Sequence, residues 1–272
     1  MEQRTIAFIG SGNMAEAIFS GMLASDYDKN RIIAANRGRE RLEYIRNKYG
    51  IQITQNNHEA TEKADVVVMS VKPQMMEEVC TALTDIDFSS KLVISIAAGV
   101  TSQRIASLLN SDIALVRVMP NTPSLLNRGM SGLFANENVS ENDKQYAQQL
   151  LKSVGEICWT EQETGINSIT GISGSGPAYF FLFMEAIQQE AQRQGFDSET
   201  ARMLVQQTAL GAAEMVVNNP DLNISTLRER VTSKGGTTAA ALSTFNAHAL
   251  NDIVSKAIQS AVSRAEEMEK LF

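Results

Sequence analysis

The first half of the chain alternates short apolar runs with stretches of helical character. The apolar runs, rich in valine and isoleucine, lie at residues 5–9, 31–35, 65–71, 91–97 and 114–119. Helical patterns such as 14–23 and 39–48 separate them. Buried strands that alternate with helices are typical of a parallel sheet covered by helices on both faces. The pattern therefore predicts an α/β domain with a doubly wound parallel sheet.

Beyond this region the pattern changes from strands to helices. Two weaker apolar runs at 131–136 and 156–160 can extend the sheet, with a helix at 141–153 between them. After about residue 160 the strand pattern stops. Asp197 can cap a helix whose apolar positions include Ala201, Leu204, Val205, Ala209 and Ala212. We expect residues 1–160 to form the α/β domain and residues 161–272 an all-helical domain.

The final helix of the predicted helical domain carries a wide apolar stripe. Its apolar residues recur at i, i+3 and i+4 spacing: Leu250, Ile253, Val254, Ala257, Ile258, Ala261, Val262 and Ala265. The apolar faces of this domain can exceed what one copy buries, which would favour a homodimer through its helices. Packing within a single chain explains the stripe almost as well.

Composition and charge argue against several classes of partner. The chain has 272 residues and a net charge of −7, whereas binding to a nucleic-acid backbone needs a basic stripe. The longest apolar run, around 178–184, falls well short of the roughly 20 residues that span a bilayer. The first residues, MEQRTIAFIG, lack the layout of a signal peptide. We therefore expect a cytoplasmic protein without a nucleic-acid or membrane partner.

The few cysteines and histidines form no metal-binding pattern. Cys80 and Cys158 make no CxxC motif, and His58 and His248 are the only histidines. We expect no metal site and two reduced thiols. Neither histidine lies in a catalytic loop by its sequence context, since His58 precedes a helix and His248 sits at the start of the last one. Surface or capping roles are the expectation for both.

The segment IAFIGSGNMAEAI contains a glycine motif between the first strand and the first helix. It places Gly10, Gly12 and Ala15 in the GxGxxG/A pattern of dinucleotide-binding loops. Gly10 would permit a tight turn, Gly12 the close approach of a pyrophosphate, and Ala15 the packing of the helix near the strand. The position of the motif in the first βαβ unit predicts a Rossmann-type dinucleotide-binding domain.

The residues after the second strand bear on which dinucleotide is bound. In AANRGRER, Asn36 and Arg37 stand where an NAD-specific domain usually places an acidic residue, and no carboxylate appears before Glu40. An arginine there can neutralise a 2′-phosphate. Alternatively, Arg37, Arg39 and Arg41 only solvate the start of a helix. The pattern favours NADPH, although NADH can also serve.

Three further segments carry candidate chemistry. Lys72, in SVKPQ, follows a strand beside Pro73, and it can be structural or functional. SITGISGSGPAYFF places Gly171, Gly174 and Gly176 before a helix, where glycines let the backbone approach a flat ligand such as nicotinamide or let helices pack closely. VTSKGGTTAAAL, at 231–242, presents free backbone N–H groups at a helix start, which can bind an anion.

Six motifs together resemble the pyrroline-5-carboxylate reductases: GSGNMA at 10–15, VKP at 71–73, AAGV at 97–100, MPNTP at 119–123, SGSGPAY at 173–179 and TSKGGTT at 232–238. The resemblance spans essentially the whole chain. It implies NAD(P)H-dependent reduction of a cyclic imine, 1-pyrroline-5-carboxylate, to L-proline, the last step of proline biosynthesis. The related β-hydroxyacid dehydrogenases would place a catalytic lysine at position 180, but this chain has Phe180.

The implied chemistry accounts for the missing acid–base pair. An imine nitrogen can be protonated before the hydride arrives, so the enzyme needs orientation and proximity more than proton transfer. By resemblance, the substrate would be bound by Ser233, Gly235, Gly236, Thr237 and Thr238. The N–H groups around Gly235, Gly236 and Thr237 would hold its carboxylate. Thr238 would also be catalytic, because its hydroxyl would face the ring nitrogen.

The resemblance also implies a set of cofactor-binding residues. They come from seven places along the chain: Gly10, Ser11, Gly12, Asn13, Met14 and Ala15; Asn36 and Arg37; Asn57; Val71, Lys72 and Pro73; Ala97, Ala98 and Gly99; Met119, Pro120 and Asn121; and Ser175, Gly176 and Pro177. The family also implies homodimers through the helical domain that can assemble further, often into decamers.

One residue departs from the family pattern. The late loop of the family commonly reads SPGG, whereas this chain has Lys234 in place of the proline, which bears on fine substrate preference. Two rival hypotheses remain: a reductase of a related imine or short keto acid on the same scaffold, and a non-catalytic dinucleotide-binding regulator. The Thr237–Thr238 pair disfavours the regulator.

Overall fold

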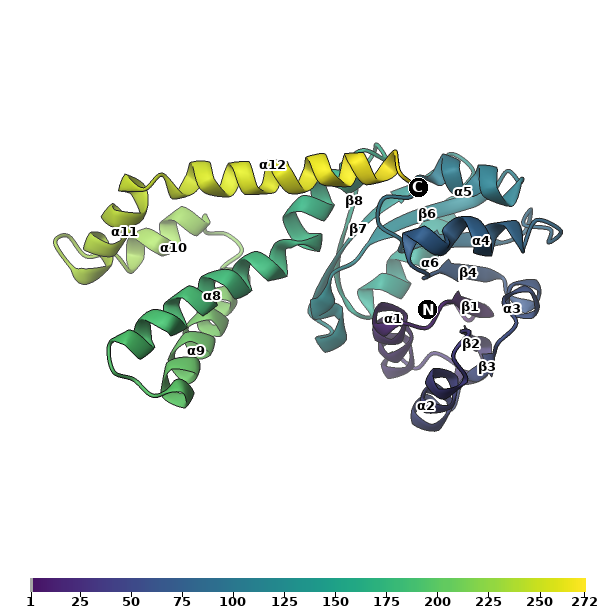
Figure 1. The fold of residues 1–272 in the computed structure, drawn as a ribbon, viewed down its shortest axis with the longest axis horizontal. Helices are drawn as coiled ribbons and strands as arrows, with labels where there is room; N and C mark the ends of the chain where they lie inside the picture. The colour runs from purple at the N-terminus through teal and green to yellow at the C-terminus, as the bar shows by residue number, and fades with distance from the viewer. Residues whose placement is uncertain (1) are drawn as a thin grey trace. The chain divides into compact units, whose positions relative to one another are not determined.

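The computed structural model describes residues 2–272, and the chain forms two compact units. The first contains residues 1–177 together with Ser260–Phe272, and the second contains Ala178–Gln259. The chain crosses from one unit to the other inside two long helices, α8 (Gly176–Arg193) and α12 (Leu250–Glu269). Figure 1 shows the elements of both units along the chain.

The first unit is built on one eight-stranded sheet in the order β3-β2-β1-β4-β5-β6-β7-β8. All neighbours are parallel except β6 and β7, which are antiparallel. The strands are β1 (Ile6–Ile9), β2 (Ile32–Ala35), β3 (Gln52–Thr54), β4 (Val66–Met69), β5 (Leu92–Ser95), β6 (Ala114–Met119), β7 (Gly129–Ala135) and β8 (Gly155–Trp159). The predicted α/β class is confirmed. Strand β3 was not predicted, because it is only three residues long and none of them is fully buried.

Helices cover both faces of the sheet because side chains alternate along each strand. In β1, Ile6 and Phe8 belong to one core and Ala7 and Ile9 to the other. The first core also receives side chains from α1, α2 and α6, and the second from α3, α4 and α5. These helices are α1 (Asn13–Ala24), α2 (Arg39–Tyr49), α3 (Asn57–Lys63), α4 (Met76–Thr81), α5 (Ser102–Leu109) and α6 (Glu141–Lys152).

The strand order reverses at β1, whose neighbours are β2 on one side and β4 on the other. In open α/β sheets, ligands bind at the carboxyl ends of the strands at such a switch point. The backbone closes this point tightly, since Gly10 N–H donates to Ala35 O at 3.0 Å and Ser70 N–H to Ile9 O at 2.9 Å. The glycine motif therefore lies where the topology favours a ligand.

A buried ionic cluster joins the last turns of α12 to the sheet. The Arg117 side chain, on β6, is 3% exposed and pairs with Glu163 at 2.7 Å and Glu269 at 2.9 Å. Glu163 also accepts hydrogen bonds from the backbone and hydroxyl of Ser102, and Glu269 accepts one from Asn167. One buried cation thus organises two carboxylates that are far apart in the sequence.

The second unit consists of helices, as expected for the chain after the last strand. It contains most of α8, the first half of α12 and the three helices between them. These three are α9 (Ser198–Val217), α10 (Ile224–Arg230) and α11 (Thr237–Ala247). The predicted cap of α9 is confirmed, because Asp197 Oδ1 accepts the Thr200 N–H at 2.9 Å. Among residues 2–272, no helix has the length and apolar character needed to cross a bilayer.

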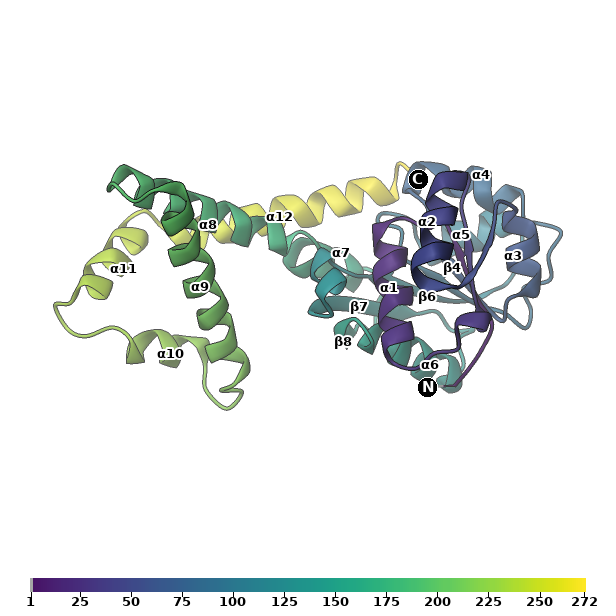
Figure 2. The ribbon, with the colours of Figure 1, turned by 90° about the horizontal axis from the view of Figure 1, so that it is seen from below.

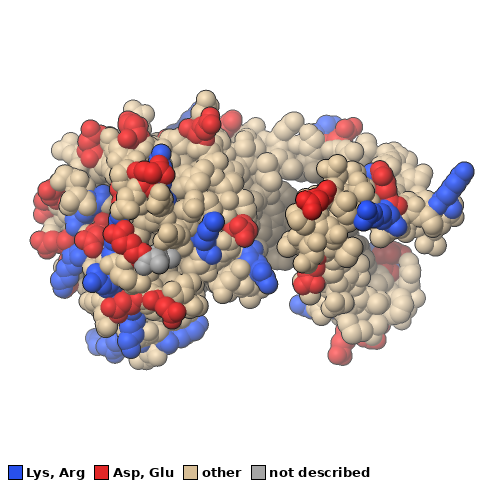
Figure 3. Space-filling view, turned by 180° about the vertical axis from the view of Figure 1, so that it is seen from behind, with Lys and Arg blue, Asp and Glu red and all other residues tan. Residues whose placement is uncertain are grey.

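Large apolar side chains are exposed on this helical unit in the single chain. They include Phe180, Phe181, Leu182, Met203, Leu204, Leu210, Met215, Val217, Ile253 and Val254. The rings of Phe183 and Phe245 contact each other inside the unit, with centroids 5.9 Å apart. Much of the surface of the unit seen in Figure 3 carries no charged side chain. The exposure of so many large apolar side chains on one unit is typical of an interaction surface.

Candidate functional site

The turn from β1 into α1 has the conformation of a ligand-binding glycine loop. Gly10 has φ +92°, in the region that favours glycine, and a Cβ there would lie 2.8 Å from Ser70 O. The structure thus gives Gly10 the tight-turn role that the motif predicts. Ser11 is buried, and its hydroxyl donates to Ala35 O at 3.0 Å. The Ser11 hydroxyl proton is therefore already donated within the protein and is not available to a phosphate.

Gly12 differs from Gly10, because nothing in the protein requires a glycine there. Its backbone is extended, with φ −75° and ψ −172°, and a Cβ would meet no atom within 4 Å. It is the N-cap of α1 without a side-chain cap, so the N–H groups of the first turn, from Asn13 and Met14, have no partner inside the helix. Open space in front of free helix-start N–H groups fits a phosphate. Ala15 is 1% exposed in the core, as the motif predicts.

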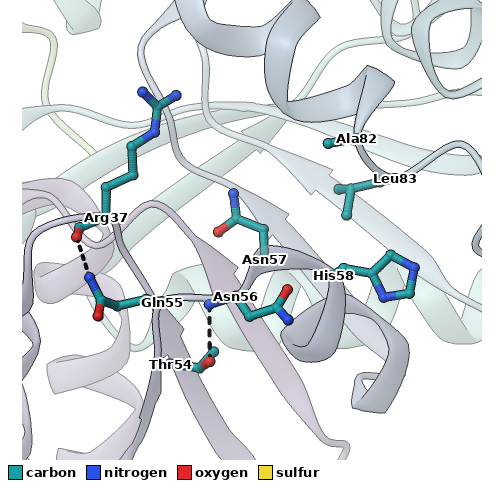
Figure 4. Close-up of a pocket in the computed structure, with 8 residues that line it drawn as sticks. All are labelled: Arg37, Thr54, Gln55, Asn56, Asn57, His58, Ala82 and Leu83. Atoms are coloured by element: carbon teal, nitrogen blue, oxygen red, sulfur yellow. Dashed lines mark hydrogen bonds between the residues drawn. The ribbon is translucent and has the colours of Figure 1, made fainter.

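A second feature is a pocket of about 520 Å³ beyond the end of β2. Arg37 and Asn57, both predicted to bind the cofactor, lie on its wall (Figure 4). The remaining lining residues are Thr54, Gln55, Asn56, His58, Ala82 and Leu83. Four of these lie at the end of β3 or just after it, and β3 is the strand that was not predicted, so the sequence pattern did not single them out as a group. The adenosine end of a dinucleotide would extend to this side of the switch point.

Arg37 is held only loosely at this pocket. Its Nη2 lies 2.9 Å from Glu78 Oε1, and both side chains are mostly exposed, so the pair contributes little stability. The Arg37 carbonyl accepts a hydrogen bond from Gln55 Nε2 at 2.6 Å, which fixes its backbone (Figure 4). Its neighbour Asn36 makes a long hydrogen bond to Gly38 O at 3.4 Å. The guanidinium can therefore exchange Glu78 for another anion.

The three arginines after β2 do not play one common role. Arg39 is exposed and pairs with Glu43 on its own helix at 2.9 Å. Arg41 turns the other way, where its Nε donates to Ser11 O at 2.8 Å and its Nη2 pairs with Glu16 at 2.5 Å. The interpretation that these residues only solvate a helix start does not describe Arg41.

Glu16, on α1, is the centre of a charged cluster. Besides Arg41 it accepts hydrogen bonds from Lys48 at 3.0 Å and Tyr49 at 2.5 Å. Burial raises the pKa of Glu16, but the hydrogen bonds from Tyr49, Lys48 and Arg41 outweigh it and lower the pKa to about 2. Glu16 is therefore charged at neutral pH and its charge is locally compensated.

The ends of β4 and β5 supply further predicted residues. The Lys72 side chain is exposed and, among residues 2–272, has no hydrogen-bond or ion-pair partner, while Val71 and Pro73 are half-buried beside it. Gly99 has φ +71°, and a Cβ there would lie 2.6 Å from Met268 Cβ. Local packing therefore explains this glycine without a ligand. Ala97 is buried and Ala98 half-buried in the same turn.

The segment that leads into α8 separates two kinds of glycine. A Cβ on Gly174 would lie 2.6 Å from Met119 Cε, so this glycine serves close packing. A Cβ on Gly176 would meet nothing within 4 Å, which leaves room for a ligand beside Ser175 and Pro177. Gly174 ends a π-helical turn, Thr170–Gly174, and such turns occur frequently at functional sites. The two alternatives left open by the sequence thus apply to different glycines.

Asn121, predicted to bind the cofactor, has its side chain engaged in hydrogen bonds within the protein. Its Nδ2 donates to Ser173 O at 3.0 Å and its Oδ1 accepts the Met130 N–H at 2.9 Å. Pro120 is buried and Met119 half-buried beside it. The Asn121 side chain therefore ties the loop after β6 to the π-helical turn.

The late loop lies in the helical unit and opens α11. Gly235 has φ +74°, which favours glycine, whereas a Cβ on Gly236 would meet the Ser233 hydroxyl, a side-chain group that can rotate. The Gly236 N–H donates to Ser233 O at 3.0 Å, which removes it from the predicted anion clamp. The N–H groups of Gly235 and Thr237 have no hydrogen-bond partner within the described chain. Gly236 caps α11 without a side-chain hydrogen bond, and Thr238 is half-buried in the first turn.

The histidines and cysteines lie outside these features or at their edge. His58 pairs with Asp85 at 3.1 Å on the rim of the pocket. His248 ends α11 rather than beginning α12, and its Nδ1 lies 2.9 Å from Thr244 O, in a capping position. Cys80 and Cys158 are free thiols, and burial raises the pKa of Cys80 to about 12.

Two family models match the chain. Residues 163–268 match the model described as pyrroline-5-carboxylate reductase dimerisation. Residues 5–99 match the one described as NADP oxidoreductase coenzyme F420-dependent. The two matches correspond to the helical part of the chain and to the start of the sheet with its glycine loop.

Several proteins that are similar to this chain over its whole length are pyrroline-5-carboxylate reductases. The chain is 59% identical to a pyrroline-5-carboxylate reductase of Vibrio alginolyticus and 50% identical to one of Haemophilus influenzae, each over 100% of both chains. A pyrroline-5-carboxylate reductase structure from Coxiella burnetii superposes with a TM-score of 0.93 at 43% identity, covering 98% of this chain and 99% of that one. A Plasmodium falciparum pyrroline carboxylate reductase with NADP bound gives 0.87 at 29% identity, with 99% of each chain covered. This chain belongs to the pyrroline-5-carboxylate reductase family.

Proposed function

We propose that this chain reduces 1-pyrroline-5-carboxylate to L-proline with NADPH as the preferred hydride donor. The observation that carries the proposal is the 59% identity over the whole of both chains to a relative that bears this name. The glycine loop and the late loop supply the chemical features that such a reaction needs. A cytoplasmic location is part of the same proposal.

The residues of the glycine loop and the pocket fit a dinucleotide. The free N–H groups at the start of α1 would bind the pyrophosphate in the space that Gly12 leaves open. Arg37 would exchange Glu78 for a 2′-phosphate, and Asn57 would contact the adenosine. NADPH supplies the hydride when it is bound, and the other predicted cofactor residues would line the rest of its site.

The late loop supplies what a small anionic imine requires. The Gly235 and Thr237 N–H groups, together with the positive end of α11, would hold the substrate carboxylate. The Thr238 hydroxyl would hydrogen-bond to the ring nitrogen and hold the C=N carbon for hydride attack. A protonated imine is already electrophilic, so orientation is the main contribution of the protein.

The chain would act as an oligomer. The match to a dimerisation model and the exposed apolar residues of the helical unit support a homodimer formed through that unit. Further assembly, up to a decamer, is part of the same proposal. We also propose that the functional domains are residues 1–160, which bind the dinucleotide, and 161–272, which bind the substrate and form the dimer.

The test is an assay of the purified protein in which the oxidation of NADPH is monitored through the loss of NADPH absorbance. We expect turnover with 1-pyrroline-5-carboxylate and none above background with short acyclic keto acids. Turnover only with keto acids would favour the rival reductase. Cofactor binding without any turnover would favour the regulator.

Thr238→Ala tests the role of the hydroxyl. We expect kcat to fall by about tenfold or more, because the hydrogen bond to the reacting group is lost, while the Kd of NADPH stays unchanged. Thr244→Ala, which removes a hydroxyl later in the same helix, is the matched control and should keep full activity. If Thr238→Ala instead abolishes NADPH binding, the residue belongs to the cofactor site.

A further inference from the structure

The peptide unit between Ser11 and Gly12 is fixed from the side of helix α2. Arg41, in the first turn of α2, donates from Nε to Ser11 O at 2.8 Å. The preceding peptide is fixed from the end of β4, because Ser70 Oγ donates to Gly10 O at 2.5 Å. Gly10 N–H and Ser11 Oγ also donate to Ala35 O, each at 3.0 Å. The loop is therefore restrained on both flanks before any ligand binds. Figure 2 shows α1 and α2 on the same side of the sheet.

This restraint fixes the direction of one N–H group. The chain has no cis peptide bond among its described residues, and in a trans peptide the C=O and N–H of one unit point in opposite directions. Because Ser11 O points to Arg41, Gly12 N–H points away from α2. No group in the described part of the chain accepts this N–H. A Cβ added to Gly12 would also meet no atom within 4 Å, so the space beside this residue is open.

Arg41 also offsets a charge that would oppose an anion. Glu16, in the first turn of α1, lies near the helix start that would bind the pyrophosphate. Its carboxylate is 12% exposed and is paired with Arg41 at 2.5 Å and Lys48 at 3.0 Å. Without Arg41, this negative charge near the loop would be only partly compensated.

We propose that Arg41 is a positioning residue for the pyrophosphate of the dinucleotide. It holds the Ser11–Gly12 peptide so that Gly12 N–H is directed to the phosphate, and it neutralises Glu16. The inference rests on the proposed function, because the pyrophosphate belongs to the dinucleotide proposed there. Since NADPH and NADH share this group, Arg41 serves both cofactors equally, in contrast to Arg37.

The test is cofactor binding by calorimetry on the purified full-length protein, with NADPH and NADH titrated separately. Arg41→Met should raise the Kd of both cofactors by about tenfold, the loss expected for one charge-assisted hydrogen bond and its orienting effect. Arg39→Met is the matched control, because within residues 2–272 the Arg39 side chain pairs only with Glu43, and it should leave both values unchanged. A rise for NADPH alone would overturn the proposal and make Arg41 a 2′-phosphate ligand, and no rise at all would overturn it as well.

Arg41→Lys covers the case in which the methionine variant does not fold. The lysine ammonium keeps a positive charge beside Glu16. It lacks the several N–H donors of the guanidinium, with which Arg41 reaches Ser11 O and Glu16 at the same time. Both Kd values should rise severalfold, with the kcat for pyrroline-5-carboxylate reduction unchanged at saturating cofactor; unchanged Kd values would contradict the proposal. If the wild-type protein bound neither cofactor, the proposed function would fail instead, so the two failures are distinguishable.

Discussion

Substitution by alanine should have opposite effects on the free energy of unfolding at Gly10 and at Gly12, the two glycines of the first loop. Gly10→Ala places a side chain at φ +92° and a Cβ 2.8 Å from Ser70 O and 2.9 Å from Val71 Cγ1. The positive φ alone costs about 1–2 kcal/mol, and the overlap with a backbone oxygen brings the loss of unfolding free energy to about 2–3 kcal/mol. Gly12→Ala meets no neighbouring atom and keeps an allowed backbone. It should be neutral or stabilise by about 0.5 kcal/mol, because alanine restricts the unfolded chain.

Gly12→Ala, which should not destabilise the fold, should nevertheless weaken cofactor binding. The new methyl group of Gly12→Ala occupies the space in which the pyrophosphate would approach the loop, so the Kd of NADPH should rise by about tenfold or more. Urea unfolding of the cofactor-free protein at matched protein concentration measures the stability, and calorimetry measures the Kd. If Gly12→Ala loses as much stability as Gly10→Ala, or keeps wild-type affinity for NADPH, then Gly12 is not there to admit the pyrophosphate.

Three other predictions test separate parts of the structure. Arg37→Asp should raise the Kd of NADPH about tenfold more than that of NADH in calorimetry; equal losses would refute a 2′-phosphate role. Arg117→Met leaves Glu163 and Glu269 without their buried partner and should lower the unfolding free energy by about 3 kcal/mol in urea, a loss that Glu269→Gln should partly restore. The pKa of Glu16 is lowered to about 2, so its pairs stabilise the fold above about pH 4.5 and are lost as the pH falls towards 2; Glu16→Gln should flatten the stability profile in that window, and an unchanged profile would contradict the pairing.

The sheet and the glycine loop could be predicted from the sequence because their signals are local. Strands buried on both faces need continuous apolar runs, and the turn after β1 needs glycine at Gly10 for its positive φ. The apolar stripe of the last helix followed from spacing alone. In each case the residues that carry the signal are neighbours in the chain.

The parts that the sequence could not supply depend on tertiary contacts. The pocket beside Arg37 is lined by residues after β3, a strand too short to show a pattern. Arg41 looks like its neighbour Arg39 in the sequence, and only the packing of α2 beside α1 turns it to Ser11 O. Likewise, Gly174 and Gly176 belong to one motif, but one contacts Met119 and the other faces open space.

Product analysis tests the central proposal most directly. The purified protein is incubated with 1-pyrroline-5-carboxylate and NADPH, and the L-proline formed is quantified against the NADPH consumed. We predict that one L-proline is formed for each NADPH oxidised. Absence of proline, or oxidation of NADPH without a matching amount of proline, would contradict the account.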